Sequence, residues 1–399
     1  MTDMKASSTP HQPPIAVLFT QQMVGLGTRK TGMVFWAEAL ARAGYESYAV
    51  TTQLSALSRL VGAARLNAVP RADRNVWRKC GERLHGFVWV PAFHPARSRI
   101  GWLDRMATAI WEFYPRLLPE AVLEVVRRAD IVVIESCAAL LLFDALKKVA
   151  PPTAKFVYCA SDRLSTVGMH PMLDDVLNRS APLYDLVRIP ARAMAKDFPP
   201  GSPVQYIPHG IDKAIFDKPG PSPFGNRGPT VVVAGDMLFD GEAFGVLLDS
   251  FPDVFFHTFG RMNLDQFGQR PNLVVHGEVP FEVLAAYLPH ADVGFAPYVD
   301  RPKAHYLVES SLKLIQYTYC RLPIVAPNFA TVGRDHVIGY TPGDDESLRA
   351  ALTAALDLDR DAVDTCGVIS WDEVIERVLG KVGLPTAAQL TPALVPERG

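Results

Sequence analysis

The sequence predicts two doubly wound α/β domains, each built on a mostly parallel β-sheet. Apolar, β-rich runs alternate with segments of helix length along the whole chain. Several of these runs, such as IVVIE and VVVA, are continuously apolar, which is typical of strands buried on both faces of a parallel sheet. The length of 399 residues is too great for one ordinary core and suits two domains.

The strands of the first domain are expected at seven places, which are Ile15–Thr20, Glu46–Thr52, Phe87–Val90, Ile131–Glu135, Lys155–Ala160, Leu186–Ile189 and Val204–Ile207. Those of the second are expected at Thr230–Ala234, Val254–Phe259, Leu273–His276, Asp292–Ala296 and Ile324–Ala326. The alternation with helices makes both sheets parallel and covered on two faces.

The domain boundary is predicted at the Pro/Gly-rich stretch that follows YIPHGID. We expect a polar tail at 1–14, a first domain at 15–212, a second domain at 213–383 that ends in a helix, and a loose tail at 384–399. Because α/β sheets bind ligands at the C-terminal edges of their strands, two such domains facing each other would enclose a cleft. A cleft of this kind suits an enzyme that joins two substrates.

The composition indicates a cytosolic protein that can lie against a membrane. Five cysteines without a Cys-x-x-Cys pair are typical of free thiols in a reducing compartment. The N-terminus lacks an apolar signal core, and no run reaches the roughly 18 apolar residues that span a bilayer. The net charge is −2, but residues 59–116 hold 11 basic and 4 acidic side chains, a local excess that attracts anionic surfaces.

Asp162 is the candidate catalytic base. It follows the run KFVYCAS directly, so it should lie at the carboxyl end of a buried strand. A carboxylate there can take a proton from an attacking hydroxyl group. Position alone also allows two structural roles, a cap for the next helix or an ion pair with Arg163.

The segment Ser310–Pro327 predicts a helix from the two serines to about Cys320, followed by a strand. Lys313 falls in the first turn, where the helix dipole disfavours a cation by roughly 1 kcal/mol or less. An anion at that helix end, such as a diphosphate, would explain the lysine. Gln316, one turn on, lies on the same face and could reach a ribose hydroxyl. The alternative is an ordinary helix with a surface lysine.

Three further candidates follow predicted strands of the second domain and should therefore meet at one sheet edge. Gly235-Asp236-Met237 resembles a tight turn that admits a ligand, Glu278 follows LVVHG, and Tyr298 ends DVGFAPY. In the first domain the loop GLGTRKTG fits neither a P-loop nor a dinucleotide fingerprint. It places Arg29 and Lys30 where they could bind an anionic acceptor, although an exposed basic loop without a role is equally consistent.

The segment Ile100–Leu118 has apolar residues at helical spacing with arginines around them. Such a helix can lie in a membrane interface, although a core-facing helix shows the same pattern. The flanking basic run favours the membrane. Metal binding has little support, because the one Asp-x-Asp stretch, at Asp357–Asp361, has no neighbouring ligands. We expect no metal and no cofactor.

Several motifs together resemble a known family. YIPHGIDKAIF and SSLKLIQYTYCRLPIVAP are similar to the interdomain and nucleotide-binding segments of GT-B glycosyltransferases. More narrowly, TRKTGM, TTQLSAL, FHP, CASDRLSTVGMHP, GDMLFD and SSLKLIQY resemble the β-glucuronosyltransferases of xanthan assembly (GumK). The resemblance runs from about residue 15 to 380, and the pairing of CASDR with SSLKLIQY is its most specific part.

The resemblance implies an inverting, metal-independent enzyme, peripheral to the cytoplasmic face of the bacterial inner membrane. It would move glucuronate from UDP-glucuronate to the mannose of a polyprenyl-diphosphate-linked oligosaccharide in exopolysaccharide (xanthan-like) biosynthesis. Asp162 would then be the base and Lys313 would hold the diphosphate of UDP. The UDP pocket would be lined by Met237, Glu278, Tyr298, Leu312 and Gln316.

Other functions remain open on the sequence. The chain could transfer the sugar of another UDP-sugar, or it could be a UDP-sugar 2-epimerase of the same fold, which needs no acceptor. A third hypothesis is a protein without enzymatic activity that binds a nucleotide sugar at the membrane. The means of recognising the uronate carboxylate is not indicated by any motif.

Overall fold

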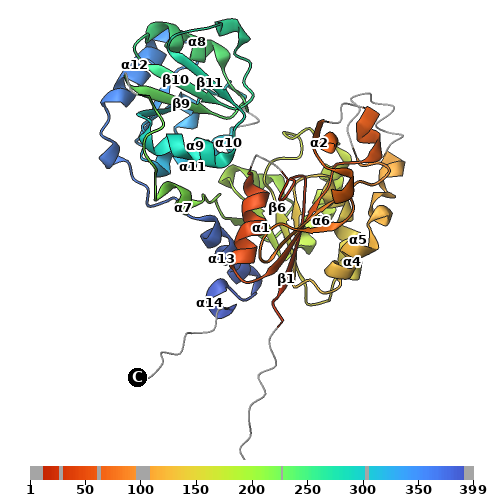
Figure 1. Cartoon of the computed structure of the whole chain (residues 1–399). Coiled ribbons are helices and arrows are strands. Elements are labelled where there is room, and N and C mark those ends of the chain that lie inside the picture. The colour runs from red at the N-terminus through yellow and green to blue at the C-terminus, as the bar shows by residue number, and fades with distance from the viewer. Residues whose placement is uncertain are drawn as a thin grey trace, which may run out of the picture.

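The computed structural model describes residues 12–26, 30–60, 64–95, 108–225, 228–301 and 305–390. They form two β-sheets, one in each half of the chain, and the first is parallel except at one edge strand while the second is parallel throughout (Figure 1). In spatial order, the first sheet consists of β3 (Trp77–Lys79), β4 (Leu84–Val88), β2 (Glu46–Thr51), β1 (Ile15–Thr20), β5 (Ile131–Glu135), β6 (Lys155–Cys159), β7 (Leu186–Ile189) and β8 (Val204–Tyr206). The second consists of β11 (Leu273–Gly277), β10 (Phe255–Phe259), β9 (Thr230–Ala234), β12 (Val293–Phe295), β13 (Ile324–Pro327) and β14 (Val337–Tyr340).

Eleven of the twelve predicted strands form within one residue of their expected bounds, most of them from apolar runs that are buried, whereas β4 covers Leu84–Val88 instead of the predicted Phe87–Val90. Every residue of β5 and of β9 is buried. The second sheet has the doubly wound order in which the chain starts at the centre and fills both sides. Two strands were not predicted. β3 is a short polar strand antiparallel to β4, and β14 is a four-residue edge strand.

Helices cover both faces of each sheet. Those of the first half are α1 (Gly32–Arg42), α2 (Ala64–Asn67), α4 (Glu120–Val126), α5 (Phe143–Val149) and α6 (Met172–Ser180). Those that follow are α7 (Lys213–Phe216), α8 (Gly241–Ser250), α9 (Phe281–Tyr287), α10 (Tyr306–Glu309), α11 (Leu312–Tyr319), α12 (Asp345–Asp357), α13 (Trp371–Val382) and α14 (Ala387–Leu390). One apolar core extends from α1 to α9 and so joins the two halves.

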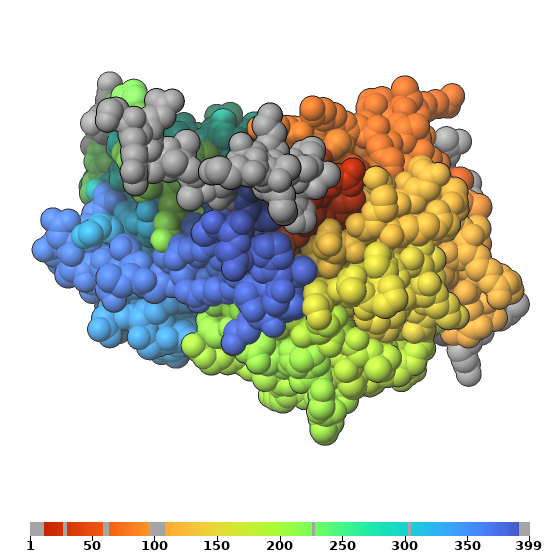
Figure 2. Space-filling model, turned by 90° about the horizontal axis from the view of Figure 1, so that it is seen from below, coloured from red at the N-terminus to blue at the C-terminus, as the bar shows by residue number. Residues whose placement is uncertain are grey.

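The C-terminal part of the chain returns to the first sheet. Helix α13 packs against α1 and β7, and the ring of its Trp371 stacks on Phe35 at 5.4 Å. Residues 384–390, which the sequence predicts to be part of a loose tail, pack here instead: Pro385 O accepts a hydrogen bond from the Tyr45 hydroxyl, and Ala387–Leu390 form α14. Figure 2 shows this dark blue segment at the centre of the face, beside yellow residues of the first half.

The segment Ile100–Leu118 differs from the continuous helix that was predicted. Residues 100–107 lie outside the described part of the chain, and the helix seen at 108–111 ends before Pro115. Proline lacks the N–H that a helix interior needs, so a short 3-10 turn at Tyr114–Leu117 follows instead. Trp111 and Tyr114 are buried, whereas Ile110 and Phe113 are exposed. None of the described helices has the length and apolarity to cross a bilayer.

Candidate active site

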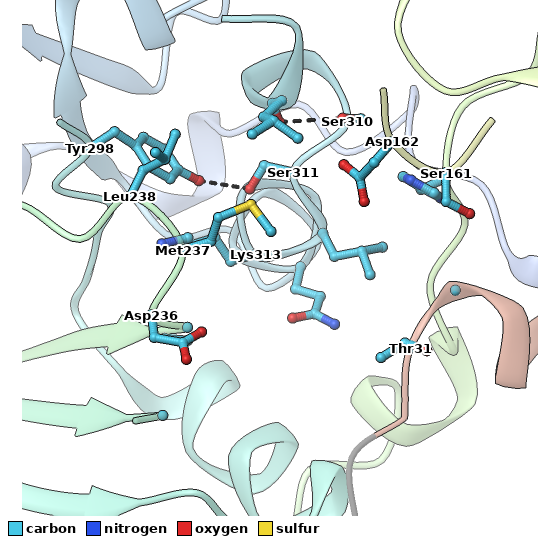
Figure 3. A pocket seen from close by; sticks show the side chains of 18 of the residues that line it. Thr31, Ser161, Asp162, Asp236, Met237, Leu238, Tyr298, Ser310, Ser311 and Lys313 are labelled. Carbon is cyan, nitrogen blue, oxygen red and sulfur yellow. Dashed lines mark hydrogen bonds between the residues drawn. The ribbon is translucent and has the colours of Figure 1, made fainter. Parts of the chain in front are cut away.

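A cavity of about 530 Å³ lies between the C-terminal edges of the two sheets, and its wall includes both candidate catalytic residues. Asp162 comes from the first half and Lys313 from the second (Figure 3). Met237, Glu278, Tyr298, Leu312 and Gln316 line the same cavity. The structure therefore brings together the residues that the sequence analysis assigned to a donor pocket.

Asp162 lies three residues beyond the end of β6 and is held by two other residues, Ser136 and Tyr306. Its backbone N–H donates to Oγ of Ser136 at 3.0 Å. The hydroxyl of Tyr306, on α10, donates to its Oδ1 at 3.3 Å. Arg163, the alternative ion-pair partner, binds Asp197 instead, with Nε 2.6 Å from Oδ2. The carboxylate of Asp162 is thus directed into the cavity and is available to a substrate.

The environment of Asp162 raises its pKa from 3.8 to about 7. Burial is the main cause, the nearby carboxyl of Glu135 adds to it, and the hydrogen bond from Tyr306 opposes it. Glu135 ends β5 and is itself buried, with Oε2 accepting hydrogen bonds from the Thr20 hydroxyl at 2.5 Å and from the Gln21 N–H at 3.0 Å. A carboxyl with a pKa near 7 is well matched to general-base catalysis at neutral pH.

Helix α11 begins at the cavity, and its N-cap is Ser311, whose Oγ accepts the N–H of Leu314. Lys313 lies in the first turn, with Nζ 4.4 Å from the ring centre of Tyr298. The Tyr298 hydroxyl is 2.8 Å from Oγ of Ser311, so this buried side chain supports both the cap and the lysine. Burial lowers the pKa of Lys313 to about 8, partly offset by the carboxylate of Asp236. A desolvated cation at a helix N-terminus is a strong site for a diphosphate.

The remaining donor-pocket candidates differ in their surroundings. Met237 is largely exposed, and Gln316 is buried beside the cavity. Glu278 forms an ion pair with Arg261, which sequence reasoning had not singled out. Gly260 follows β10 with φ +132°, and a Cβ there would lie 3.4 Å from Cα of Gly235. These two glycines bring the ends of β9 and β10 close together at the cavity wall.

The basic loop of the first half is only partly described. Arg29 lies outside the described residues. Lys30 lines the cavity, but its Nζ is 3.3 Å from Glu38 and 3.6 Å from Glu282. Two carboxylates therefore compete with any anionic acceptor for this lysine.

Sequence reasoning missed several residues of the cavity. Glu135 carried a signal, since an acidic residue ended the apolar run IVVIE at the functional edge of the sheet. Tyr306 carried no such signal, because no local sequence pattern relates it to Asp162, which lies 144 positions earlier. His209 also lines the cavity, and its motif YIPHGID by itself predicts only the boundary between the two domains. Among the described residues, no three His, Cys, Asp or Glu side chains are grouped as metal ligands would be.

Comparison with known sequences finds similarity over nearly the whole chain. The family model described as "Glucuronosyltransferase GumK, N-terminal domain" matches residues 18–190. The chain is 32% identical, over 357 residues, to the UDP-glucuronate:glycolipid 2-beta-glucuronosyltransferase of Xanthomonas campestris pv. campestris. That alignment covers 90% of this chain and 87% of the relative.

Several solved structures share the arrangement of the two sheets. Sucrose-phosphate synthase from Thermosynechococcus elongatus has a TM-score of 0.60 at 12% identity, covering 91% of this chain and 97% of that one. The trehalose-6-phosphate synthase OtsA has a TM-score of 0.58 at 12% identity, covering 93% and 99%. HepE of Anabaena, in complex with UDP and glucose, has a TM-score of 0.56 at 15% identity, covering 92% and 99%.

Proposed function

The chain belongs to the GumK glucuronosyltransferase family and has the GT-B fold of glycosyltransferases, and on that premise we propose that it transfers glucuronate from UDP-glucuronate to a glycolipid. The acceptor would be the mannose of a polyprenyl-diphosphate-linked oligosaccharide, in the synthesis of a xanthan-like exopolysaccharide. The reaction would invert the anomeric centre and need no metal. The name of the relative contains both UDP-glucuronate and glycolipid. It supports UDP-glucuronate as the donor and a glycolipid as the class of acceptor.

The placement of Asp162 and Lys313 in one cavity is the observation that carries this proposal. Asp162 takes the proton of the acceptor hydroxyl while its oxygen attacks the anomeric carbon of the donor. The bond between that carbon and the β-phosphate oxygen breaks, and its electron pair leaves with UDP. A single displacement on an α-linked donor gives a β-linked product.

Lys313 and the N-terminus of α11 would supply the positive charge that the leaving group needs. The oxygen that leaves gains negative charge in the transition state, and preorganised donors beside it lower the barrier. An ammonium group and helix N–H groups can provide this stabilisation without a divalent cation. These groups are the reason for proposing a metal-independent reaction.

The donor would lie along the C-terminal edge of the second sheet, with its ribose near Glu278 and Gln316. A carboxylate is a strong acceptor for ribose hydroxyl groups, and Glu278 is held in place by Arg261. Met237 and Leu312 would give apolar contact to the base and the sugar. In this position the anomeric carbon would lie between Lys313 and Asp162.

The same proposal places the enzyme on the cytoplasmic face of the inner membrane. Ile110 and Phe113 are exposed apolar side chains, and the guanidinium of Arg116 lies 4.7 Å from the ring centre of Phe113. Apolar side chains beside basic ones suit the interface of an anionic leaflet. An enzyme held there would meet a lipid-linked acceptor directly.

The test is UDP release from a panel of UDP-sugars, with a lipid-linked oligosaccharide acceptor and EDTA present. Wild type should turn over UDP-glucuronate only when the acceptor is added, and Asp162→Asn should lower kcat by about 100-fold or more. The matched control is Asp174→Asn, an exposed carboxylate on α6. Turnover confined to another donor would overturn the assigned specificity. Acceptor-independent conversion of the donor to an isomer would indicate an epimerase instead.

A further inference from the structure

Arg188 is a completely buried cation that has no carboxylate partner in the part of the chain that the structure describes. It lies on β7, in register with Cys159 of β6, on the face of the sheet that α1 and α13 cover. Its side chain is 0% exposed, and its Nε has no hydrogen-bond partner among the described residues. None of the described carboxylates forms an ion pair with it. Its other contacts are weak ones, with the Cys159 sulfur 3.9 Å from Nη1 and the Trp36 ring centre 5.7 Å from the guanidinium. A buried charge without an ionic partner costs several kcal/mol, so its presence requires a reason.

His209 connects Arg188 to the cavity. Nη2 of Arg188 is 3.3 Å from Nδ1 of His209, and His209 is 8% exposed in the cavity wall. Since a guanidinium can only donate, Nδ1 must accept, and the imidazole proton is therefore on Nε2. The ring thus offers an N–H donor with a positive charge directly behind it.

The N-terminus of α1 adjoins this pair. A Cβ on Gly32, the first residue of α1, would lie 3.7 Å from Cε1 of His209. Within the described ranges, no side chain caps the helix, and the hydroxyl oxygen of Thr31, the N-cap residue, is buried and finds no hydrogen-bond partner. Thr31, Gly32 and His209 all line the cavity. A helix dipole and a buried guanidinium thus direct positive potential at one part of the wall.

We propose that Thr31, Gly32 and His209, with Arg188 behind them, form the subsite that binds the carboxylate of the donor's uronic acid. This inference rests on the proposed function and deepens it. The subsite belongs to the first half, across the cavity from Lys313, so it would hold the sugar while α11 holds the diphosphate. A neutral hexose would leave the buried charge uncompensated, which gives the site its selectivity.

The other basic side chains of the described cavity wall are less suited to this role. Arg261 is paired with Glu278, and Lys30 with Glu38 and Glu282. Arg301 is exposed to solvent, where a charge contributes little to selectivity. Arg188, and not Arg301, would therefore be the residue that makes the enzyme select a uronate donor.

The experiment measures Kd by calorimetry for UDP, UDP-glucose and UDP-glucuronate in wild type, Arg188→Met, Arg188→Lys and His209→Phe. Methionine fills a similar volume, and replacing a buried charge with an apolar group is often neutral or stabilising, so Arg188→Met should keep its Tm. It should weaken binding of UDP-glucuronate by about 10- to 100-fold and leave UDP and UDP-glucose within about 3-fold. Arg188→Lys should restore part of the preference, and His209→Phe should behave like Arg188→Met.

Two matched controls complete the design. Arg179→Met, on the exposed end of α6, should change none of the three affinities. Arg301→Met should keep the preference for UDP-glucuronate. An equal loss for all three ligands in Arg188→Met, an unchanged preference there, or loss of preference in Arg301→Met would each overturn the inference. A wild-type enzyme that prefers UDP-glucose would contradict the proposed function instead.

Discussion

The hydroxyl of Tyr306 donates a hydrogen bond to Oδ1 of Asp162 at 3.3 Å, although 144 residues separate the two in the chain. Tyr306 lies on α10, which ends one residue before Ser310 and two before the cap of α11. Glu309, at the end of α10, pairs with Arg192 of the first half at 2.9 Å. Helix α10 thus carries Tyr306, which hydrogen-bonds to the catalytic base Asp162. The same helix leads directly into α11, whose N-terminus is proposed to bind the diphosphate.

Tyr306→Phe should raise the pKa of the catalytic base. The hydrogen bond from Tyr306 stabilises the carboxylate form of Asp162 and lowers its pKa from the value that burial alone would give. Without it, the acidic limb of the kcat/KM profile should move up by roughly one pH unit. Activity should fall several-fold at pH 6.5 and change little at pH 9. The control is Tyr287→Phe, and an equal loss at every pH would argue for a purely structural role.

Asp162→Asn should stabilise the protein at alkaline pH. The folded pKa of Asp162 is about 7, above its ordinary value of 3.8, so the folded state holds the proton more tightly than the unfolded state. Its contribution to stability is complete below about pH 4 and is lost as the pH rises through 7. The Tm difference between variant and wild type should therefore be more positive at pH 8 than at pH 5. A constant difference in thermal melts over that range would contradict the raised pKa.

UDP binding should be coupled to proton uptake at Lys313. The pKa of Lys313 is about 8 in the free protein, so at pH 8.5 most molecules carry a neutral amine there. A diphosphate favours the charged form, and binding should take up most of one proton. Calorimetry in buffers of different ionisation enthalpy measures this number directly. Lys313→Met should abolish the uptake and raise the Kd of UDP by about 10- to 100-fold. Uptake that persists in the variant would assign the proton to another group.

The double variant Ile110→Ser and Phe113→Ser should weaken binding to membranes. Both side chains are about half exposed, at 53% and 50%. Sedimentation with vesicles of anionic phospholipid should show several-fold less bound protein than wild type, because apolar area no longer enters the interface. Leu183→Ser, on a separate exposed leucine, is the control and should bind as wild type does. Equal binding of both variants would remove this surface from the proposed membrane face.

The sequence predicted those parts of the fold that depend on local patterns. Runs such as Ile131–Glu135 and Thr230–Ala234 were found because every residue in them is buried. β3 was missed because its three residues WRK are polar or amphipathic and pair at an edge. The helix over Ile100–Leu118 was extended too far, since the apolar spacing was weighed above the proline at 115.

In the candidate site, too, the residues with a local sequence signal were predicted and those defined by tertiary contacts were not. Asp162 and Lys313 were identified from their positions after a strand and at a helix start, which are local features. Tyr306 and Arg188 were not, because their roles come from neighbours that only the tertiary structure provides. A tyrosine in a loop-rich stretch and an arginine within a strand have no distinctive spacing.

The return of α13 to the first sheet has a consequence for synthesis on the ribosome. Helix α13 covers part of α1, and its Trp371 stacks on Phe35. Helix α13 begins at residue 371. The whole second sheet has therefore been translated before α13, which covers part of the first half, emerges from the ribosome. N-terminal domains usually fold first during translation, but here the nascent first half would keep an apolar face open until the end. Nascent chains stalled before residue 371 should therefore bind chaperones and be cleaved by proteases, whereas the released chain should not.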